Sequence, residues 1–391
     1  MHRRAASAHA LAPTLDAAVD VQRRLIDDLK AGRDPNVENP PIADYIAQWI
    51  AGRQTIKPDA RRRYTQSYQH QIKPLRIGKL RLQQLTREHV RQWVQAAAEL
   101  PSQDDPARTL DPYSIRNAFA VLRAALNTAV HDGLLPVNPC SGIELPAPND
   151  GEITPLSPEE VHALLDLVDT YEGDQAHRLA ALYHVAIKLG LRQGELLGLR
   201  WRDVDFRARV VRVTGQQKRA GRASGKTSKA HRSLPLTDDL IRMLRAHQLS
   251  QGEERRLMGA GFNQADLVFV SEVGTPILPR NLYRQYTAFQ RRAGLCTPCS
   301  VCHGSGARPT DRKRQQGPCP ACDGHGSIAT YRFHDLRHTY AALALAAGVE
   351  LFTLSRQMGH SSISVTADRY GRLYHGAADN AAAIERYLRK A

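Results

Sequence analysis

The sequence contains no long apolar stretch, and only six of its 391 residues are cysteines. Because a helix needs about 18 consecutive apolar residues to span a bilayer, a transmembrane protein is not expected. The N-terminal segment, which begins Met1-His2-Arg3-Arg4, is not followed by an apolar run long enough for a secretory signal. We therefore expect a cytoplasmic, nucleoid-associated protein without membrane contact, whose cysteines stay reduced or bind metal.

Acidic residues are too few to balance the basic ones. Lys and Arg number 54 against 39 Asp and Glu, which gives a formal net charge of +15. An excess of that size favours a polyanionic partner, and the lack of a membrane-spanning run favours nucleic acid over an anionic membrane. The 391 residues are enough for two or three domains, and a hydrophobic content of 42% is enough for each to have its own core.

The first part of the chain is helical in pattern. Apolar residues recur at helical spacing in segments at 42–50, from 58 onward, at 86–99 and at 113–131. With short loops between them, these segments predict an all-α domain over residues 39–146. Residues 1–38 are expected to form a separate, mostly polar N-terminal helical segment.

Basic residues of this first domain are candidates for contacts with nucleic-acid phosphates. The segment from residue 58 carries three consecutive arginines between helical aromatic residues. The candidates are Arg61, Arg62, Arg63, Lys73 and Arg116. A solvated helix face explains any one of these positions equally well.

A second domain is predicted over residues 153–391. Prolines and a glycine at 144–151 indicate a linker, and Ser157-Pro158-Glu159-Glu160 forms a capping box that starts a helix. Strands are expected at 210–213 and 233–236, with a basic, Gly-rich loop between them. The expected fold class is mainly α with a small β-sheet, in which an all-α domain precedes a mixed α/β domain.

Six residues of the second domain are of the types needed for a reaction in which a tyrosine attacks a phosphate. They are Arg192, Lys226, His334, Arg337, His360 and Tyr370. His334 and Arg337 are three residues apart, which places them on one face of a helix. Two guanidiniums can each hold phosphate oxygens bidentately and stabilise the charge of the transition state. Each residue alone is a weak signal, and the argument rests on the whole set in this order.

The set and its local motifs resemble the tyrosine recombinase family, the phage-type integrases. The motifs are Gly190-Leu191-Arg192-Gln193-Gly194-Glu195, His334-Asp335-Leu336-Arg337-His338 and Met358-Gly359-His360-Ser361-Ser362. The resemblance implies a site-specific DNA recombinase or integrase whose core-binding and catalytic domains clamp double-stranded DNA. It also implies a homotetramer on DNA, with an excisionase or DNA-bending proteins as accessory partners.

Within this resemblance, Tyr370 is the nucleophile and forms a 3′-phosphotyrosine link that conserves the bond energy, so neither ATP nor a catalytic metal is needed. A free tyrosine has a pKa of about 10 and needs a base at neutral pH. His334 is weakly preferred as that base, and Lys226 is the candidate acid for the departing 5′-hydroxyl. Tyr374 is a rival nucleophile, and Arg372 stands where relatives often have a histidine.

Two other functions stay open. A type IB topoisomerase shares this chemistry, although the two-domain layout and the short segment after Tyr370 argue against it. The second alternative is a DNA-binding zinc-ribbon interaction protein with an inactive recombinase fold. This alternative predicts the loss of a catalytic residue, and none is lost.

In the resemblance, residues 1–38 correspond to the remnant of an arm-binding domain.

An insertion at residues 296–330 of the second domain contains a duplicated Cys-x-x-Cys-x-Gly-x-Gly unit. Its cysteines Cys299, Cys302, Cys319 and Cys322 have the spacing of a structural zinc site with four thiolate ligands. Cys296 could replace Cys299, and His303 and His325 are weaker ligand candidates. Cys140 is expected to be a small core residue of the first domain.

Overall fold

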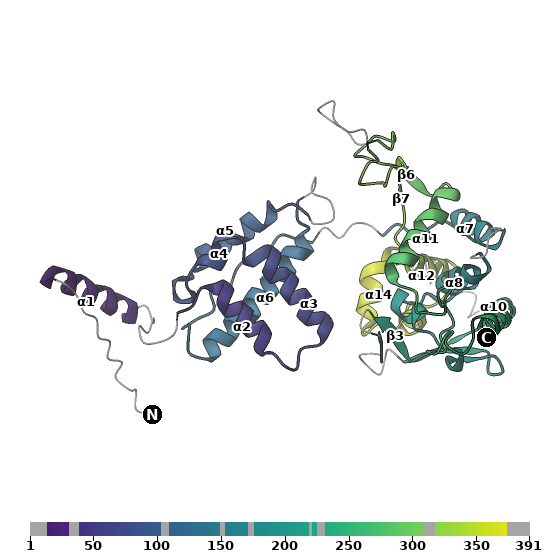
Figure 1. The fold of residues 1–391 in the computed structure, drawn as a ribbon, viewed down its shortest axis with the longest axis horizontal. Coiled ribbons are helices and arrows are strands. Elements are labelled where there is room, and N and C mark those ends of the chain that lie inside the picture. Colours follow the sequence, from purple (N-terminus) through teal and green to yellow (C-terminus); the bar gives the residue numbers. More distant parts are fainter. Residues whose placement is uncertain are drawn as a thin grey trace, which may run out of the picture. The chain divides into compact units, whose positions relative to one another are not determined.

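The computed structural model describes residues 14–30, 39–102, 109–148, 153–170, 176–218, 221–224, 231–307 and 317–373. The chain forms two compact units, Met1–Gly151 and Glu152–Ala391 (Figure 1). None of the helices in the described ranges has the length and apolar character that crossing a membrane requires.

The described part of the first unit is built from helices. They are α1 (Leu15–Lys30), α2 (Ile42–Gly52), α3 (Pro58–Ser67), α4 (Arg76–Lys79), α5 (Arg87–Ala98) and α6 (Pro112–His131), with a π-helical turn at Tyr68–Ile72 and a 3-10 turn at Leu82–Gln84. The apolar faces of α2, α5 and α6 meet in one core, in which Trp49 donates its Nε1–H to Thr128 Oγ1 at 2.9 Å. Cys140 is buried in this core, as predicted.

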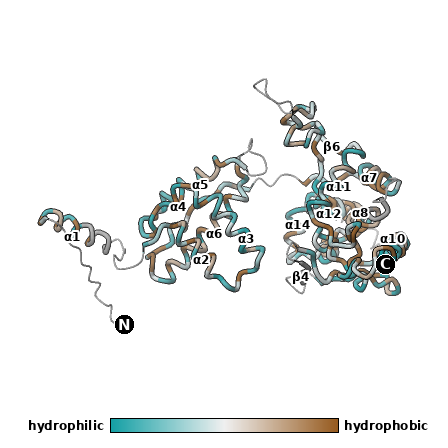
Figure 2. Tube along the Cα trace, viewed as in Figure 1, coloured by the Kyte–Doolittle hydropathy of each residue, from teal (hydrophilic) through white to brown (hydrophobic). Residues whose placement is uncertain are grey.

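The second unit packs helices around a small sheet. Its helices are α7 (Pro158–Thr170), α8 (Ala176–Leu189), α9 (Gln193–Leu197), α10 (Asp238–Met258), α11 (Pro279–Arg292), α12 (Asp335–Ala346), α13 (Leu351–Met358) and α14 (Ile363–Tyr370), with 3-10 turns at Trp201–Asp203 and Gly371–Leu373. Helix α8 contacts α7, α10 and α12, and its Tyr183 is fully buried. Hydropathy alternates along these helices because each has a buried and an exposed face (Figure 2).

The sheet has the antiparallel order β1-β2-β5, formed by Val204–Asp205, Val210–Val213 and Arg232–Pro235. The two predicted strands are therefore present, the second of them one residue earlier than expected. The intervening segment, predicted as a loop, contains a further hairpin of β3 (Gly215–Lys218) and β4 (Gly221–Ser224). These strands are polar and rich in glycine, so they lack the apolar alternation that reveals a strand in a sequence. The predicted fold class, mainly α with a small β-sheet, is confirmed.

The cysteine-rich insertion begins and ends in a short antiparallel pair. Strand β6 (Cys296–Pro298) pairs with β7 (Ser327–Ala329), so that Cys296 lies opposite Ala329. The insertion therefore leaves the unit after α11 and returns beside its own starting point before α12 (Figure 1). This topology adds a small structure to the second unit without separating α11 from α12.

Candidate active site

Helix α12 buries Arg337 and His338, each 3% exposed, beside the buried Asp335 and Thr339. His334 occupies the N-cap position of the same helix and is exposed. The start of the helix is fixed by Asp335, whose Oδ2 accepts a hydrogen bond from the backbone N–H of Arg332 at 2.7 Å. The helix thus presents one histidine to solvent and holds the second inside the unit.

The guanidinium of Arg337 joins three segments of the chain. Nη1 donates to the carbonyl oxygen of Gly190 at 2.7 Å, and Nη2 donates to that of Met358 at 2.6 Å. Nη2 also lies 3.1 Å from Nε2 of His360. Burial, and then the nearby charge of Arg192, lower the pKa of Arg337 from 12.5 to about 9, so that it remains a cation at neutral pH.

A second guanidinium, that of Arg192, is held by Glu195. Arg192 Nη1 donates to Glu195 Oε1 at 2.8 Å, and Nη2 donates to the carbonyl oxygen of Gly359 at 2.9 Å. Glu195 also binds the buried Arg232 of β5, whose Nη2 donates to Oε2 at 2.8 Å. Burial alone would raise the pKa of Glu195, but the hydrogen bond and charge of Arg232, together with Arg192, lower it to about 2.

Two glycines of the predicted motifs make these contacts sterically feasible. Gly190 has a φ of +59°, and a Cβ there would lie 2.2 Å from the ring of Tyr340. Gly359 ends α13 in the left-handed region, with a φ of +64°, and a Cβ there would lie 2.9 Å from Arg232 Nη1. Both positions therefore require glycine, and both direct a carbonyl oxygen at a candidate arginine.

The turn after Gly359 presents His360 to the same site. Nδ1 of His360 lies 2.7 Å from Thr366 Oγ1, on the side of the ring opposite its contact with Arg337. Burial, followed by the charges of Arg337 and Arg192, lowers the pKa of His360 to about 4. A cavity of about 600 Å³ opens beside this turn, and Arg232, Gly359 and His360 are among its lining residues.

Tyr370 is the last residue of α14 and is only 1% exposed. Its ring packs in an apolar cluster with residues of α12 and α13, among them Leu345 and Leu354. Its hydroxyl lies 2.6 Å from Nδ1 of His338. Burial raises the pKa of Tyr370 above 10, although Arg337 and Arg369 oppose this effect, so that the hydroxyl is protonated at neutral pH.

Five of the six catalytic candidates lie in the described part of the second unit. Arg192, Arg337 and His360 are linked through the carbonyls around Gly359, while His334 and Tyr370 are both next to His338. Lys226 and the rival nucleophile Tyr374 lie outside the described residues.

Sequence reasoning missed several supporting residues. They are Arg232, His338 and Thr366. His338 and Thr366 contact Tyr370 and His360, and Arg232 binds Glu195, which also holds Arg192. His338 lies inside a quoted motif, next to Arg337, and could have been selected from that position. Arg232 and Thr366 reach the site only through the fold and carry no comparable signal.

The candidate DNA-binding residues of the first unit differ in their present contacts. Arg61 donates to the carbonyl oxygens of Ile50 and Arg53, and Arg116 donates to that of Pro146 at 2.9 Å. Arg62, Arg63 and Lys73 are exposed, with Arg62 3.7 Å from Asp59. The contacts of Arg61 and Arg116 tie segments of the first unit together, whereas the exposed residues are available to a phosphate backbone. DNA contact stays a prediction for all five residues.

The insertion brings four cysteines together. The Sγ atoms of Cys299, Cys302, Cys319 and Cys322 all lie within 4.8 Å of one another, and all four residues are buried. The backbone N–H groups of Gly306 and Gly326 donate to Sγ of Cys302 and Cys322 at 3.3 and 3.2 Å. Such donors stabilise thiolates, so the cluster can hold a metal ion.

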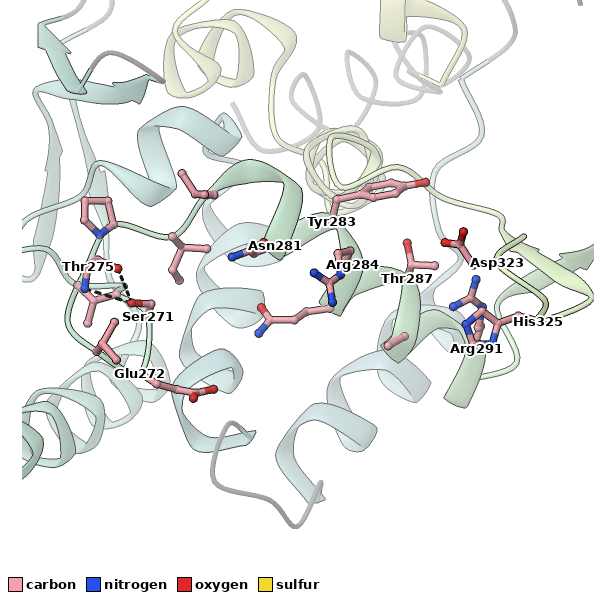
Figure 3. A pocket seen from close by; sticks show the side chains of 17 residues that line it. Ser271, Glu272, Thr275, Asn281, Tyr283, Arg284, Thr287, Arg291, Asp323 and His325 are labelled. Atoms are coloured by element: carbon pink, nitrogen blue, oxygen red, sulfur yellow. Dashed lines mark hydrogen bonds between the residues drawn. The ribbon is translucent and has the colours of Figure 1, made fainter. Parts of the chain in front are cut away.

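A second cavity, of about 860 Å³, lies between α11 and the insertion (Figure 3). Asp323 and His325 line one end of it, and Ser271 and Thr275 line the other, while Tyr283 extends from α11 between them. None of the catalytic candidates lines this larger cavity. His360 is the described candidate that lines the smaller cavity beside Gly359.

Comparisons with known proteins show which proteins this chain resembles. Residues 155–310 match the model of the phage integrase family. A tyrosine recombinase XerC-like protein of Caldanaerobacter subterraneus subsp. tengcongensis is 27% identical over 369 residues, which cover 88% of this chain and 82% of that protein. The integrase of Mycobacterium phage L5 is 27% identical over 277 residues, which cover 66% of this chain and 69% of that protein.

The fold of the Tn1549 transposon integrase, solved in complex with transposon right end DNA, is similar. Its TM-score is 0.66 at 19% identity, and the match covers 89% of this chain and 99% of that chain. The family match, the recombinase relatives and the fold together support a tyrosine recombinase, an enzyme of the site-specific recombinase class.

The buried pair of Glu195 and Arg232 gives a stability prediction. Replacement Glu195→Gln leaves Arg232 buried without a counter-charge and should lower the free energy of unfolding by about 3 kcal/mol at neutral pH. Because the pKa of Glu195 is lowered to about 2, its contribution is present above pH 4.5 and is lost as the pH falls toward 2. Urea unfolding of both proteins between pH 7 and pH 3 measures the difference.

The exposed Glu272 provides the matched control, since Glu272→Gln removes the same charge from the same unit. It should change the free energy of unfolding by less than about 0.5 kcal/mol. Equal losses from the two replacements would contradict a structural role for the Glu195 ion pair.

Proposed function

We propose that this chain cleaves and rejoins double-stranded DNA at specific sites through a 3′-phosphotyrosine link to Tyr370. The observation that carries the proposal is the joint placement of Arg192 and Arg337 on the turn at Gly359, within the unit that holds Tyr370. The described part of this site has three guanidiniums around one carboxylate, Glu195. Such an excess of positive charge suits a phosphodiester better than a neutral substrate.

In the proposed reaction, Arg192 and Arg337 hold the non-bridging oxygens of the scissile phosphate, and His360 adds a further contact. A guanidinium has five N–H donors, so Arg337 keeps donors for an anion in addition to those that bind carbonyl oxygens. The Tyr370 oxygen attacks phosphorus, the bond to the 5′-oxygen breaks, and Lys226 supplies the proton to that oxygen. The link conserves the bond energy for rejoining, without ATP or a catalytic metal.

The remaining parts of the proposal concern DNA and assembly. The Tn1549 integrase and a lambda integrase dimer were both solved bound to DNA, the latter to a core site. We propose that the first unit, over residues 39–146, contacts core-type DNA through Arg62, Arg63 and Lys73, and that four copies act together. Accessory proteins that bend DNA or set direction are part of the same proposal.

Replacement Tyr370→Phe should abolish covalent attachment to DNA because the ring stays but the nucleophilic oxygen is lost. The measurement is adduct formation on a nicked suicide substrate taken from DNA that flanks the encoding element, in the presence of EDTA. Tyr374→Phe is the matched control and should keep the adduct. DNA binding by Tyr370→Phe should equal that of the wild type, since the hydroxyl is buried.

An adduct that persists in Tyr370→Phe and disappears in Tyr374→Phe would reassign the nucleophile. Specific DNA binding without any adduct in the wild type would favour an inactive recombinase fold that serves as a binding module.

We also propose that the cysteine cluster of the insertion binds a structural zinc ion. Four thiolates about 2.3 Å from zinc in a tetrahedron lie about 3.8 Å apart. The Sγ atoms of Cys299 and Cys319 are 4.0 Å apart, and those of Cys302 and Cys322 are 3.7 Å apart, which fits this geometry. His303 and His325 are not in the cluster.

Replacement Cys299→Ser should reduce bound zinc from about one ion per chain to well below half, and should destabilise the insertion because structural zinc contributes folding free energy. Cys296→Ser is the matched control, since Cys296 lies on β6 outside the cluster and should leave the zinc content unchanged. Elemental analysis and limited proteolysis measure both effects. Wild-type protein purified without zinc, or zinc lost only in Cys296→Ser, would contradict the proposal.

A further inference from the structure

The hydroxyl of Tyr370 contacts His338, not the base candidate His334. The distance from Tyr370 Oη to His338 Nδ1 is 2.6 Å, and both side chains are buried. His334 meets the ring of His338 edge-on, with 5.0 Å between ring centroids, and it is exposed. The two histidines of α12 therefore occupy different positions relative to the nucleophile.

The hydrogen bond requires a particular form of His338. A protonated tyrosine hydroxyl donates, so Nδ1 must accept and the ring proton must reside on Nε2. Burial, and then the neighbouring His334, lower the pKa of His338 to about 4, which keeps the ring neutral at physiological pH. A neutral imidazole with a free Nδ1 can accept a proton from the hydroxyl it touches.

We propose that His338 holds the hydroxyl of Tyr370 and accepts its proton when Tyr370 attacks the phosphate. This inference rests on the proposed function and assigns the base of its first step. As the bond between the tyrosine oxygen and phosphorus forms, the phenolic proton moves to Nδ1 of His338 and the bond from phosphorus to the 5′-oxygen breaks. In the rejoining step, the imidazolium returns the proton to the tyrosine oxygen as it leaves phosphorus.

This assignment gives the exposed His334 a different task. Located at the rim of α12, His334 can donate a hydrogen bond to a phosphate oxygen that approaches from solvent. It reaches Tyr370 only through the ring of His338. One histidine then serves the phosphate and the other serves the nucleophile.

The charged groups around His338 set the sign of the pH dependence. On its own helix and the preceding turn they are His334, Asp335 and Arg332, and on α14 they are Arg369 and Tyr370. Asp335 raises the pKa of His338, whereas His334, Arg369 and Arg332 lower it. A bound phosphate adds negative charge and raises this pKa. Cleavage should therefore slow as the pH falls through the pKa of His338.

The test compares His338→Asn with His334→Asn on the suicide substrate between pH 4 and pH 9. Asn carries Oδ1 near the position of Nδ1, so His338→Asn keeps an acceptor for the hydroxyl but cannot hold its proton. Adduct formation should slow by about 100-fold or more, and the loss of rate at acid pH should disappear. His334→Asn should keep that acid limb, and His338→Asn should bind DNA as the wild type does.

A His338→Asn variant with the rate and acid limb of the wild type would overturn the inference, as would loss of the acid limb in His334→Asn alone. Nitrogen NMR of the histidine rings in the wild-type protein gives a second test that does not depend on a variant. It should show His338 protonated on Nε2 with Nδ1 as acceptor, and a proton on Nδ1 would contradict the assignment. If the wild type forms no adduct at all, the proposed function itself fails.

Discussion

The arrangement of the second unit depends on the buried guanidinium of Arg337. A buried charge costs several kcal/mol unless its donors are satisfied. Among the described residues, Arg337 meets this cost with the carbonyl oxygens of Gly190 and Met358 and the ring of His360. Those three groups come from the ends of α8 and α13 and from the turn beyond, so one side chain fixes the positions of three segments. A phosphate bound there would balance the positive charge that remains beyond the single carboxylate of Glu195.

The same helix links this anion site to the nucleophile. The residue after Arg337 in the chain is His338, which holds Tyr370 in an apolar cluster where its pKa is raised. A tyrosine in that setting stays protonated until a phosphate is in place for attack and His338 can take the proton. A shift of α12 on DNA binding would act on both groups at once, since they are adjacent on one helical turn.

The sequence predicted those features that are local. Three features each lie within a few consecutive residues, so their chemistry can be predicted without knowledge of the fold. They are the His334 and Arg337 pair, the glycine turn before His360 and the paired cysteine knuckles. Arg232 of β5 contacts Glu195 of α9, 37 residues away in sequence, and Thr366 of α14 contacts His360 in the preceding turn. No sequence pattern indicates either contact. The β3–β4 hairpin escaped prediction because its polar residues lack alternation. The motif contains both histidines, and its spacing favours His334 as the base, whereas only the side-chain geometry shows that His338 touches Tyr370.

The measurement that tests the central claim most directly is mass spectrometry of the covalent complex after digestion with protease and nuclease. The account predicts a nucleotide attached to the peptide that contains Tyr370, through the residue's phenolic oxygen. A nucleotide on Tyr374 or on any other residue would contradict the assignment of the nucleophile, and with it the role of the Arg337 and His338 helix in activating it.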